Sequence, residues 1–426
     1  MENVIEILKE RSFFDAMTSE ELETLLQNPM KVYCGFDPTS DGLHLGNMVP
    51  IMALAWFQKC GHTPVALVGG ATGMIGDPSG KANERSLLDE QTIRNNSAGI
   101  EKDLRQILKG DIVFVNNVDW FKEISMIAFL RDVGKYFRIG TMMAKDSVRA
   151  RLNSSEGMSF TEFSYQLLQG YDFQHLHKEL GVSIQIGGSD QWGNITAGID
   201  LVRKLSGSQV YGMTFPLLLR SDGQKFGKSE KGSIWLSKDK LSPYEFYQYL
   251  VRVPDADVLM LMRYLTFMDM DEIRKIESSM KNADYVPNTA QKRLAEEVTT
   301  LVHGKDALEL ALKVTAAAAP GMEAVLDASA LAALGKDIPN HEMPKEALIG
   351  ASVVSLLVTI GLKDSNSEAR KLLRNGGVYI NNKRIDDERA SIELAQLIDN
   401  QFLLIAAGKK NKMLVRGVDK NHLLEN

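Results

Sequence analysis

Short apolar runs alternate with helical stretches over the first half of the chain. Lys31–Phe36, Pro64–Val68 and Val182–Ile186 are apolar runs that lead into glycines or a polar loop. They have the length and composition of buried strands. Pro50–Lys59 has the spacing of a helix, with proline in its first turn. Strand, glycine turn and helix in alternation predict an α/β domain with a doubly wound parallel sheet.

The rest of the chain divides into regions of different pattern. Residues 1–220 are expected to form the α/β domain, followed by a mobile loop over 221–238. Periodic Leu, Met and Tyr over 239–315, without a strand-like run, predict an α-helical domain. The Ala-rich stretch 316–346 predicts a linker that holds a short helix. Residues 347–426 are expected to form a separate, small α+β domain.

Composition excludes several classes of protein. The chain has 426 residues and 44% apolar residues, which is ordinary for a globular protein and unlike a disordered chain, a collagen-like repeat or a disulfide mini-protein. With 49 Lys and Arg against 55 Asp and Glu, the net charge is −6. A coat protein for nucleic acid is therefore excluded, and any nucleic-acid contact needs a local basic patch. The tail 351–426 carries about +3 by sequence count.

The cysteines and the N-terminal residues indicate a cytoplasmic protein. Cys34 and Cys60 are the only cysteines, and both lie in apolar contexts outside a C-x-x-C motif. The first residues lack the pattern of a signal peptide, and no run approaches the roughly 20 apolar residues of a membrane span. No Cys/His cluster is present, so no metal site is expected.

Polar residues that follow the predicted strands are candidate site residues, because ligands of such sheets bind at the carboxyl ends of the strands. The loop Asp37–Asn47 precedes a helix, and its imidazole and backbone N–H groups suit a phosphate. The loop Val68–Lys81 has glycines that allow close approach of a ligand, but it matches neither a dinucleotide nor a Walker motif. Its Asp77 is a candidate, as are the cations Lys81 and Arg85. An ordinary capped loop and solvated cations are the alternatives.

Further candidates lie in a lysine-containing loop and on a helix. Ser221–Ser229 contains two lysines and a terminal hydroxyl, so it can close over a triphosphate, or it is simply a solvated turn. On the predicted helix 159–173, Tyr165, Gln169 and Asp172 follow one another at i, i+4 and i+7, within an arc of about 60°. Such a stripe suits a small polar ligand, the alternative being a solvated face. The segment from Gln185 to Asn194, which begins near the end of the strand Val182–Ile186, adds Gln185, Asp190 and Gln191.

The tail contains a compact basic module. Ser365 and Glu368 form a capping box at the start of a helix. Basic side chains follow on that helix and near the end of the chain: Arg370, Lys371, Arg374, Lys409, Lys410 and Lys412. Basic residues gathered on an acidic protein indicate RNA binding, and a solvated helix is the alternative.

Together these motifs resemble the bacterial tyrosyl-tRNA synthetases of class I. His44-Leu-Gly-Asn47 and Lys225-Phe-Gly-Lys-Ser229 are similar to the two class signatures. The phrases Tyr33–Thr39, Gly69–Gly73 and Gln185–Ile195 resemble the same family in order and spacing. The resemblance covers essentially the whole chain. It implies a Rossmann-like catalytic domain, a helical domain and an S-four-like RNA-binding domain.

The resemblance also implies an activity and its partners. L-Tyrosine and ATP, with Mg²⁺, would form tyrosyl-adenylate and pyrophosphate. The tyrosyl group would then pass to the 3′-terminal adenosine of tRNA(Tyr). The family works as a cytoplasmic homodimer, without a membrane and without a permanently bound cofactor. Because the attacking carboxylate is already an anion, catalysis would rest on positioning and on stabilising charge at the phosphates.

The family pattern assigns roles residue by residue. Tyrosine would be bound by Tyr33 and Asp172 at its phenol, by Asp77, Tyr165 and Gln169 at its ammonium group, and by Gln185 and Gln191 near its carboxylate. ATP would be bound by Cys34, Gly35, Asp37, Thr39, His44, Gly46, Asn47, Asp190 and Lys228. The catalytic set would be Thr39, His44, Asn47, Lys81, Arg85, Lys225, Lys228 and Ser229. The basic residues of the tail would contact tRNA.

Some positions depart from the family, and some alternatives stay open. Asn47 replaces the second His of the first signature, and Ala406-Ala407 stand where relatives often carry arginines. A tryptophanyl-tRNA synthetase shares the fold and the signatures, although Tyr33 and Asp172 fit a phenol better than an indole. A nucleotidyltransferase of the same superfamily would not need the basic tail. A different class of protein, an RNA-binding scaffold that has lost catalysis, also stays open, although Asp77, Asp172, Lys225 and Lys228 argue against it.

Overall fold

The computed structural model describes residues 2–79, 87–154, 157–224, 226–229, 232–321, 326–408 and 410–419. The chain groups into two compact units: Met1–Lys240 with Val253–Val302, and Leu241–Arg252 with His303–Asn426. Within the described ranges, no helix combines the length and the apolar character that a membrane span requires.

The first unit is built on a six-stranded sheet in the order β1-β6-β5-β2-β3-β4. Its strands are β1 (Ala16–Met17), β2 (Lys31–Phe36), β3 (Thr63–Val68), β4 (Val113–Asn116), β5 (Ile184–Gly188) and β6 (Tyr211–Phe215). All pairs are parallel except β1 with β6, which confirms the predicted doubly wound α/β fold. The strand order reverses between β2 and β5, and ligands of such folds bind at this point.

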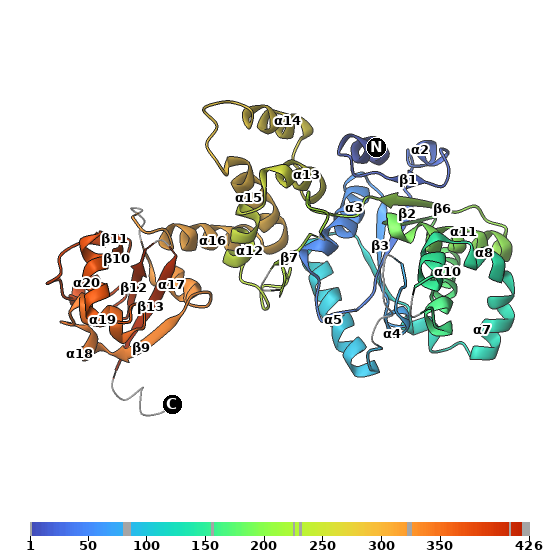
Figure 1. The fold of residues 1–426 in the computed structure, drawn as a ribbon. Coiled ribbons are helices and arrows are strands. Elements are labelled where there is room, and N and C mark those ends of the chain that lie inside the picture. The colour runs from blue at the N-terminus through green and yellow to red at the C-terminus, as the bar shows by residue number, and fades with distance from the viewer. Residues whose placement is uncertain are drawn as a thin grey trace. The chain divides into compact units, whose positions relative to one another are not determined.

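Helices cover both faces of this sheet (Figure 1). α3 (Met48–Lys59) and α5 (Glu90–Ile107) lie on one face, and α10 (Phe160–Leu180) and α11 (Trp192–Ser206) lie on the other. Phe173 and Leu176 of α10 pack with Val65 and Leu67 of β3 in a buried cluster. Ser159 caps α10 by accepting the backbone N–H of Glu162 at 3.1 Å, so the predicted helix is present and extends to Leu180.

Shorter elements complete the first unit. They are α1 (Val4–Glu10), α2 (Leu22–Leu25), η1 (Leu45–Asn47), α4 (Thr72–Ile75), α6 (Val118–Phe121), α7 (Met126–Asp132), η2 (Gly134–Tyr136), α8 (Ile139–Met143), α9 (Asp146–Leu152), η3 (Ser189–Gln191), β7 (Lys228–Ser229) and β8 (Gly232–Ser233).

The helices predicted over 239–315 are present, but they divide between the two units. α13 (Asp255–Leu265), α14 (Met270–Ser279) and nearly all of α15 (Thr289–His303) group with the sheet, whereas α12 (Pro243–Val251) and α16 (Lys305–Ala317) group with the tail. The buried Arg11 ties α13 to the first unit, because its guanidinium donates to the carbonyl oxygens of Arg263, Thr266 and Met268. The helices of residues 239–315 therefore do not group together as one separate unit.

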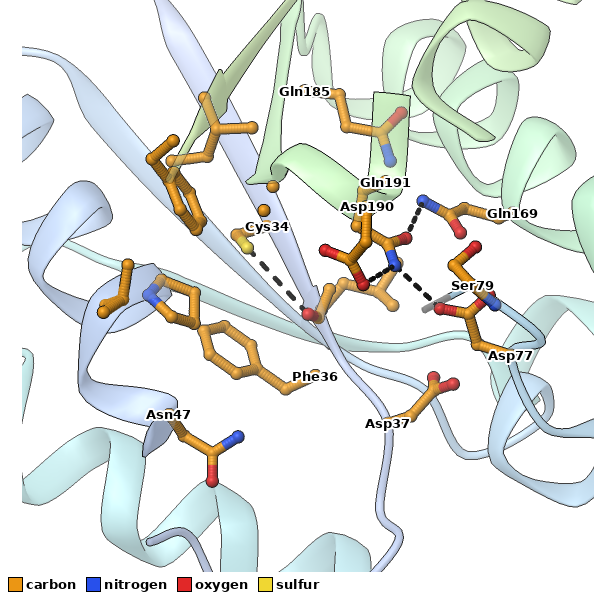
Figure 2. A pocket seen from close by; sticks show the side chains of 18 of the residues that line it. Cys34, Phe36, Asp37, Asn47, Asp77, Ser79, Gln169, Gln185, Asp190 and Gln191 are labelled. Atoms are coloured by element: carbon orange, nitrogen blue, oxygen red, sulfur yellow. Dashed lines mark hydrogen bonds between the residues drawn. The ribbon is translucent and has the colours of Figure 1, made fainter. Parts of the chain in front are cut away.

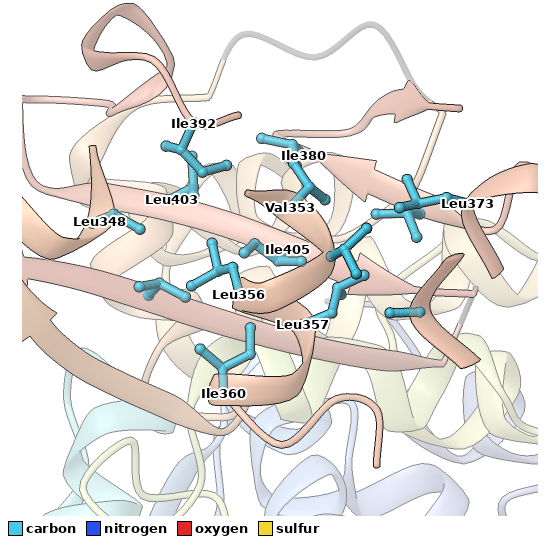
Figure 3. Packing of buried hydrophobic residues seen from close by; sticks show 14 of the residues in the cluster. Leu348, Val353, Leu356, Leu357, Ile360, Leu373, Ile380, Ile392, Leu403 and Ile405 are labelled. Carbon is cyan, nitrogen blue, oxygen red and sulfur yellow. The ribbon is translucent and has the colours of Figure 1, made fainter. Parts of the chain in front are cut away.

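The second unit contains a five-stranded sheet in the order β11-β10-β12-β13-β9. Its elements are α17 (Ala328–Leu334), β9 (Asn340–Pro344), α18 (Lys345–Leu348), α19 (Val353–Thr359), α20 (Asn366–Arg374), β10 (Val378–Ile380), β11 (Lys383–Ile385), η4 (Leu394–Gln396), β12 (Phe402–Ala407) and β13 (Asn411–Val418). Side chains of β12 alternate between two cores. Leu403 and Ile405 pack with α19 and α20 (Figure 3), and Phe402 and Leu404 pack with α16 and α17.

The region predicted as a linker, 316–346, holds both a helix and a strand. The short helix expected there is α17, whose Leu331 and Leu334 are buried in the second core. β9 pairs in parallel with β13 from Asn340↔Leu414 to Pro344↔Val418. The end of this region is therefore part of the sheet and not a free connection.

Candidate active site

A cavity of about 310 Å³ opens at the carboxyl ends of β2 and β5. It brings together residues predicted from separate motifs: Tyr33, Cys34, Gly35, Asp37, Thr39, Gly46, Asn47, Asp77, Tyr165, Gln169, Asp172, Gln185, Asp190 and Gln191. His44 lies beside this lining, at the start of η1. The position is the one expected from the strand order, because β2 and β5 flank the point where that order reverses.

Tyr33 and Asp172 form the most buried polar part of the cavity. Their exposed fractions are 1% and 2%. The Tyr33 hydroxyl has no hydrogen-bond partner among the described residues. Burial, and then the neighbouring Asp172 carboxylate, raise the pKa of Tyr33 well above its ordinary value. Burial also raises the pKa of Asp172. A buried phenol without a partner, beside a buried carboxylate, offers one donor and one acceptor to a ligand hydroxyl.

Two side chains that our sequence reasoning missed hold Asp172. Asn117 donates to Asp172 Oδ2 at 3.1 Å, and the Trp120 indole donates to Oδ1 at 3.0 Å. Asn117 is fully buried, and it also donates to Thr72 Oγ1 at 3.0 Å. Asn117 directly follows β4, which was not among the predicted strands, so our sequence reasoning had no signal for it.

Asp77 and Gln191 form a hydrogen-bonded network at the next part of the cavity (Figure 2). Gln191 Nε2 donates to Asp77 Oδ2 at 2.7 Å and to Asp190 Oδ2 at 3.2 Å. Gln169 donates to Gln191 Oε1 at 3.3 Å, and Asn194 donates to Asp77 Oδ1 at 3.3 Å. Asn194 was not predicted as a site residue, although it lies only three positions after Gln191. Carboxylate oxygens gathered in this way suit an ammonium group.

Asp37 connects three elements around the cavity. Its Oδ2 accepts the Tyr165 hydroxyl at 2.7 Å, and its Oδ1 accepts the Thr72 hydroxyl at 2.7 Å. A Cβ atom at Gly69 would lie 2.0 Å from Asp37 Oδ1, so only glycine allows this close approach of β2 and β3. Because Tyr165 donates its proton to Asp37, the lone pairs of its oxygen remain available to a cationic ligand group.

The loop of the first signature motif packs against the segment that follows the second. Leu45 N donates to Ile234 O at 2.7 Å, and His44 and Trp235 form an antiparallel bridge. Gly227 has φ +88°, and a Cβ atom there would lie 2.6 Å from Gly46 N. The structure thus joins the backbones of both motifs at one edge of the cavity.

Several predicted cations lie outside the described residues. These are Lys81, Arg85, Lys225 and Lys409, and for Lys228 and Ser229 only the backbone, in β7, is described. Within the described part of the chain, the cavity lining includes Asp37, Asp77, Asp172 and Asp190 but no Lys or Arg. No cluster of three or more His, Cys, Asp and Glu among the described residues could hold a metal ion.

Cys34 and Asp190 belong to the part of the lining predicted for ribose. The Cys34 thiol is buried, and its Sγ lies 3.9 Å from Gly35 O. Burial raises the pKa of the Cys34 thiol to about 12, so it is a neutral thiol near pH 7. A Cβ atom at Gly188 would lie 2.6 Å from Asp190 Oδ1, which places this carboxylate directly against the β5 backbone.

The predicted RNA-binding residues that the structure describes lie on α20 and at or just before the start of β13. Arg370, Lys371 and Arg374 are exposed on α20, and Arg374 pairs with Glu388. Gly408 N donates to Gly377 O at 2.7 Å, so the turn before Lys410 lies beside the end of α20. Lys410 is exposed, and Lys412 is half-buried at the start of β13.

Comparisons with known proteins agree over nearly the whole length of the chain. The family model for tRNA synthetases class I (W and Y) matches residues 25–318, and the model for the tyrosine–tRNA ligase SYY-like C-terminal domain matches residues 330–415. A tyrosine–tRNA ligase of Protochlamydia amoebophila (strain UWE25) is 62% identical over 98% of this chain and 99% of that protein. The chloroplastic/mitochondrial tyrosine–tRNA ligase of Arabidopsis thaliana is 51% identical over 97% of this chain and 83% of that protein.

Solved structures agree with this fold. The crystal structure of a C-terminally truncated mitochondrial tyrosyl-tRNA synthetase from Aspergillus nidulans superposes with a TM-score of 0.65 at 32% identity, and covers 73% of this chain and 92% of its own.

Proposed function

The chain belongs to the class I tRNA synthetases of the tryptophan and tyrosine type, and within them to the tyrosine–tRNA ligases, and from this premise we propose how its residues perform the reaction. The enzyme activates L-tyrosine with ATP to tyrosyl-adenylate and pyrophosphate. It then transfers tyrosine to the 3′-terminal adenosine of tRNA(Tyr).

Tyrosine binds with its phenol between Tyr33 and Asp172. This assignment rests above all on the Tyr33 hydroxyl, which is buried without a described partner. The Tyr33 hydroxyl donates to the phenol oxygen, and the phenol O–H donates to the Asp172 carboxylate, which Asn117 and Trp120 hold in place. Phenylalanine would leave these buried groups unpaired, and such a site discriminates strongly against an analogue that lacks the hydroxyl.

The ammonium group of tyrosine binds in the part of the cavity that is lined by Asp77, Gln169 and Tyr165. Asp77 supplies the compensating charge, and Gln169 Oε1, which has no partner among the described residues, accepts an N–H. The Tyr165 oxygen accepts a second N–H of the ammonium group, because the Tyr165 hydroxyl already donates its hydrogen bond to Asp37. Gln185, whose Oε1 is also without a described partner, and Gln191 lie near the carboxylate.

Activation is the attack of the tyrosine carboxylate on the α-phosphate of ATP, with pyrophosphate leaving. The carboxylate needs no general base, so the protein contributes by aligning the reactants and stabilising charge on the phosphates. Thr39, His44, Gly46 and Asn47 contact the phosphates, while Cys34, Gly35, Asp37 and Asp190 bind the nucleoside side. ATP enters as its Mg²⁺ complex. Lys81, Arg85, Lys225, Lys228 and Ser229 stabilise the departing pyrophosphate.

Transfer to tRNA uses the second unit. The phosphates of tRNA(Tyr) are bound by its basic side chains: Arg370, Lys371, Arg374, Lys409, Lys410 and Lys412.

The protein works in the cytoplasm, since its two cysteines are free and buried, as in proteins of reducing compartments.

The protein also forms a homodimer. Large apolar side chains of α7, α8 and the start of α10 are exposed, among them Met126 at 71%, Ile127 at 72% and Phe160 at 72%. Such side chains are typical of an interface.

The deciding experiment is ATP–pyrophosphate exchange with each of the 20 amino acids. We expect exchange with tyrosine alone and its loss in Asp172→Ala. Asp119→Ala, at a carboxylate whose side chain is 66% exposed, is the matched control and should exchange like the wild type. Exchange driven by tryptophan would overturn the specificity, and no exchange with any amino acid would overturn the proposed activity.

A further inference from the structure

A buried carboxylate outside the cavity contacts the loop of the first signature motif. Asp103 lies on α5 and is 3% exposed. Its Oδ2 accepts the backbone N–H of Leu43, the residue before His44, at 2.8 Å. Burial of a carboxylate is unfavourable unless hydrogen bonds or charges compensate it. Asp103 therefore needs an explanation beyond helix formation, since its side chain bonds to the loop and not to its own helix.

The face of α5 that carries Asp103 is shaped to receive this loop. Asn96, Gly99 and Asp103 follow one another at i, i+3 and i+7, so they share one side of the helix. Asn96 is buried and donates to Pro38 O at 3.0 Å. A Cβ atom at Gly99 would lie 2.3 Å from Asp41 O, so the loop backbone rests directly on the helix. The loop is thus held at both ends of the stretch 38–43.

The charges around Asp103 reinforce the same connection. Lys240 pairs with Asp41 of the loop, and its ammonium lies 4.2 Å from the centre of the Trp235 ring. Lys102 of α5 pairs with Asp239 at 2.6 Å. Burial raises the pKa of Asp103, while the Leu43 N–H bond and then Lys240 and Lys102 oppose that rise. The helix, the loop and the segment 235–240 therefore form one charged cluster.

Both backbone groups of Leu43 are fixed by this arrangement. Asp103 accepts its N–H, and its carbonyl accepts the N–H of Leu236 at 2.9 Å. The next residue, His44, accepts Gly46 N with its ring nitrogen, and Asn47 accepts His44 N. A shift at Leu43 would therefore be passed directly to the imidazole and to the backbone amides of Gly46 and Asn47.

We propose that Asp103 is a positioning residue for ATP: through Leu43 it holds the His44 imidazole and the Asn47 side chain, which accepts the His44 N–H, in the orientation that binds the polyphosphate. The inference rests on the proposed function of the first signature loop. It assigns a role to a residue that neither lines the cavity nor belongs to the signature. Tyrosine binding does not depend on this bond, because its predicted contacts lie elsewhere in the cavity.

The test separates ATP from tyrosine. Asp103→Leu removes the acceptor, Asp103→Asn keeps an oxygen that can accept Leu43 N–H, and Glu101→Gln alters an exposed carboxylate of the same helix. We expect Asp103→Leu to lower kcat/KM for ATP in tyrosine-dependent exchange by roughly 10- to 100-fold, the effect of displacing a reacting group by about 1 Å. The Kd for tyrosine should stay within about 2-fold. Asp103→Asn should recover most of the rate, and Glu101→Gln should match the wild type.

A second variant keeps the test decisive if Asp103→Leu does not fold. A Cβ atom at Gly42 would lie 3.1 Å from Asp103 Oδ2 and 3.5 Å from Lys240 Nζ, so Gly42→Ala displaces the carboxylate without removing it. It should also lower kcat/KM for ATP selectively. Equal losses for ATP and tyrosine, or no loss in either variant, would overturn the positioning role. Absence of exchange in the wild-type enzyme would instead overturn the proposed function.

Discussion

Replacement of Tyr33 by Phe should stabilise the free enzyme and weaken its binding of tyrosine. The Tyr33 hydroxyl is buried without a hydrogen-bond partner among the described residues. A buried polar group without a partner costs about 1–3 kcal/mol, and Tyr33→Phe removes that cost while it keeps the ring packed against Phe173. We expect the free energy of unfolding to rise by about 1 kcal/mol, which corresponds to an apparent midpoint about 2 °C higher.

The same hydroxyl should be favourable once tyrosine is bound. One hydrogen bond between neutral groups contributes about 0.5–1.5 kcal/mol, so the Kd for tyrosine should rise roughly 2- to 13-fold in Tyr33→Phe. Phenylalanine leaves the hydroxyl unpaired in the wild-type complex, so its binding should not weaken. The preference for tyrosine over phenylalanine should therefore fall by at least the same factor.

Thermal unfolding with and without tyrosine, together with exchange kinetics for both amino acids, measures these effects. Tyr264→Phe is the matched control. Tyr264 is also buried, but its hydroxyl donates to Ser12 O at 2.8 Å, so its removal should lower the unfolding midpoint and leave tyrosine binding unchanged. A lower midpoint for free Tyr33→Phe, or an unchanged Kd for tyrosine, would refute the reasoning.

The remaining predictions concern other parts of the molecule. Asn117→Ala removes the hydrogen bonds of Asn117 to Asp172 Oδ2, Thr72 Oγ1 and the Ala71 N–H. It should destabilise the protein by about 2–4 kcal/mol and raise the Kd for tyrosine at least about 10-fold, as denaturant unfolding and exchange kinetics would measure. Asp77→Asn should weaken the binding of tyrosine by roughly 10- to 100-fold. It should not change the inhibition by 3-(4-hydroxyphenyl)propionate, a competitor that lacks the ammonium group. Because burial raises the pKa of Cys34 to about 12, the folded state keeps the thiol proton that an unfolded chain loses near pH 9, so stability falls as pH rises from about 9 to 12, and alkylation at pH 8 should require unfolding. Because we propose a homodimer that forms through the exposed apolar side chains of α7, Ile127→Asp should lower the mass measured by analytical ultracentrifugation, and an unchanged mass would contradict this contact.

The parts of the fold that were predicted correctly depend on local pattern. β2, β3 and β5 were visible as apolar runs because both faces of a parallel sheet are covered. The stripe of α10 was visible because the helical repeat puts Tyr165 and Asp172 on one side, and both line the cavity. These predictions needed no knowledge of which segments meet in space.

The predictions that differ from the structure concern elements defined by tertiary contacts. β9 has the sequence Asn-His-Glu-Met-Pro and only exposed or half-buried residues, so it shows no apolar alternation, and pairing with β13 alone makes it a strand. Asn117 and Asp103 each lie in ordinary surroundings of the sequence. Their roles come from hydrogen bonds to residues 55 and 60 positions away in the chain, and no spacing rule covers such distances.

The distribution of charge separates the recognition of the two small substrates. The described lining gathers Asp37, Asp77, Asp172 and Asp190 and contains no cation. Such a lining attracts the ammonium group of tyrosine and repels the phosphates of ATP. Tyrosine can therefore be recognised by the side chains of this lining, whereas we propose that ATP draws positive charge from Lys81, Arg85, Lys225 and Lys228. On this proposal, the acidic lining selects the amino acid, and separate cations act where negative charge develops in the transition state.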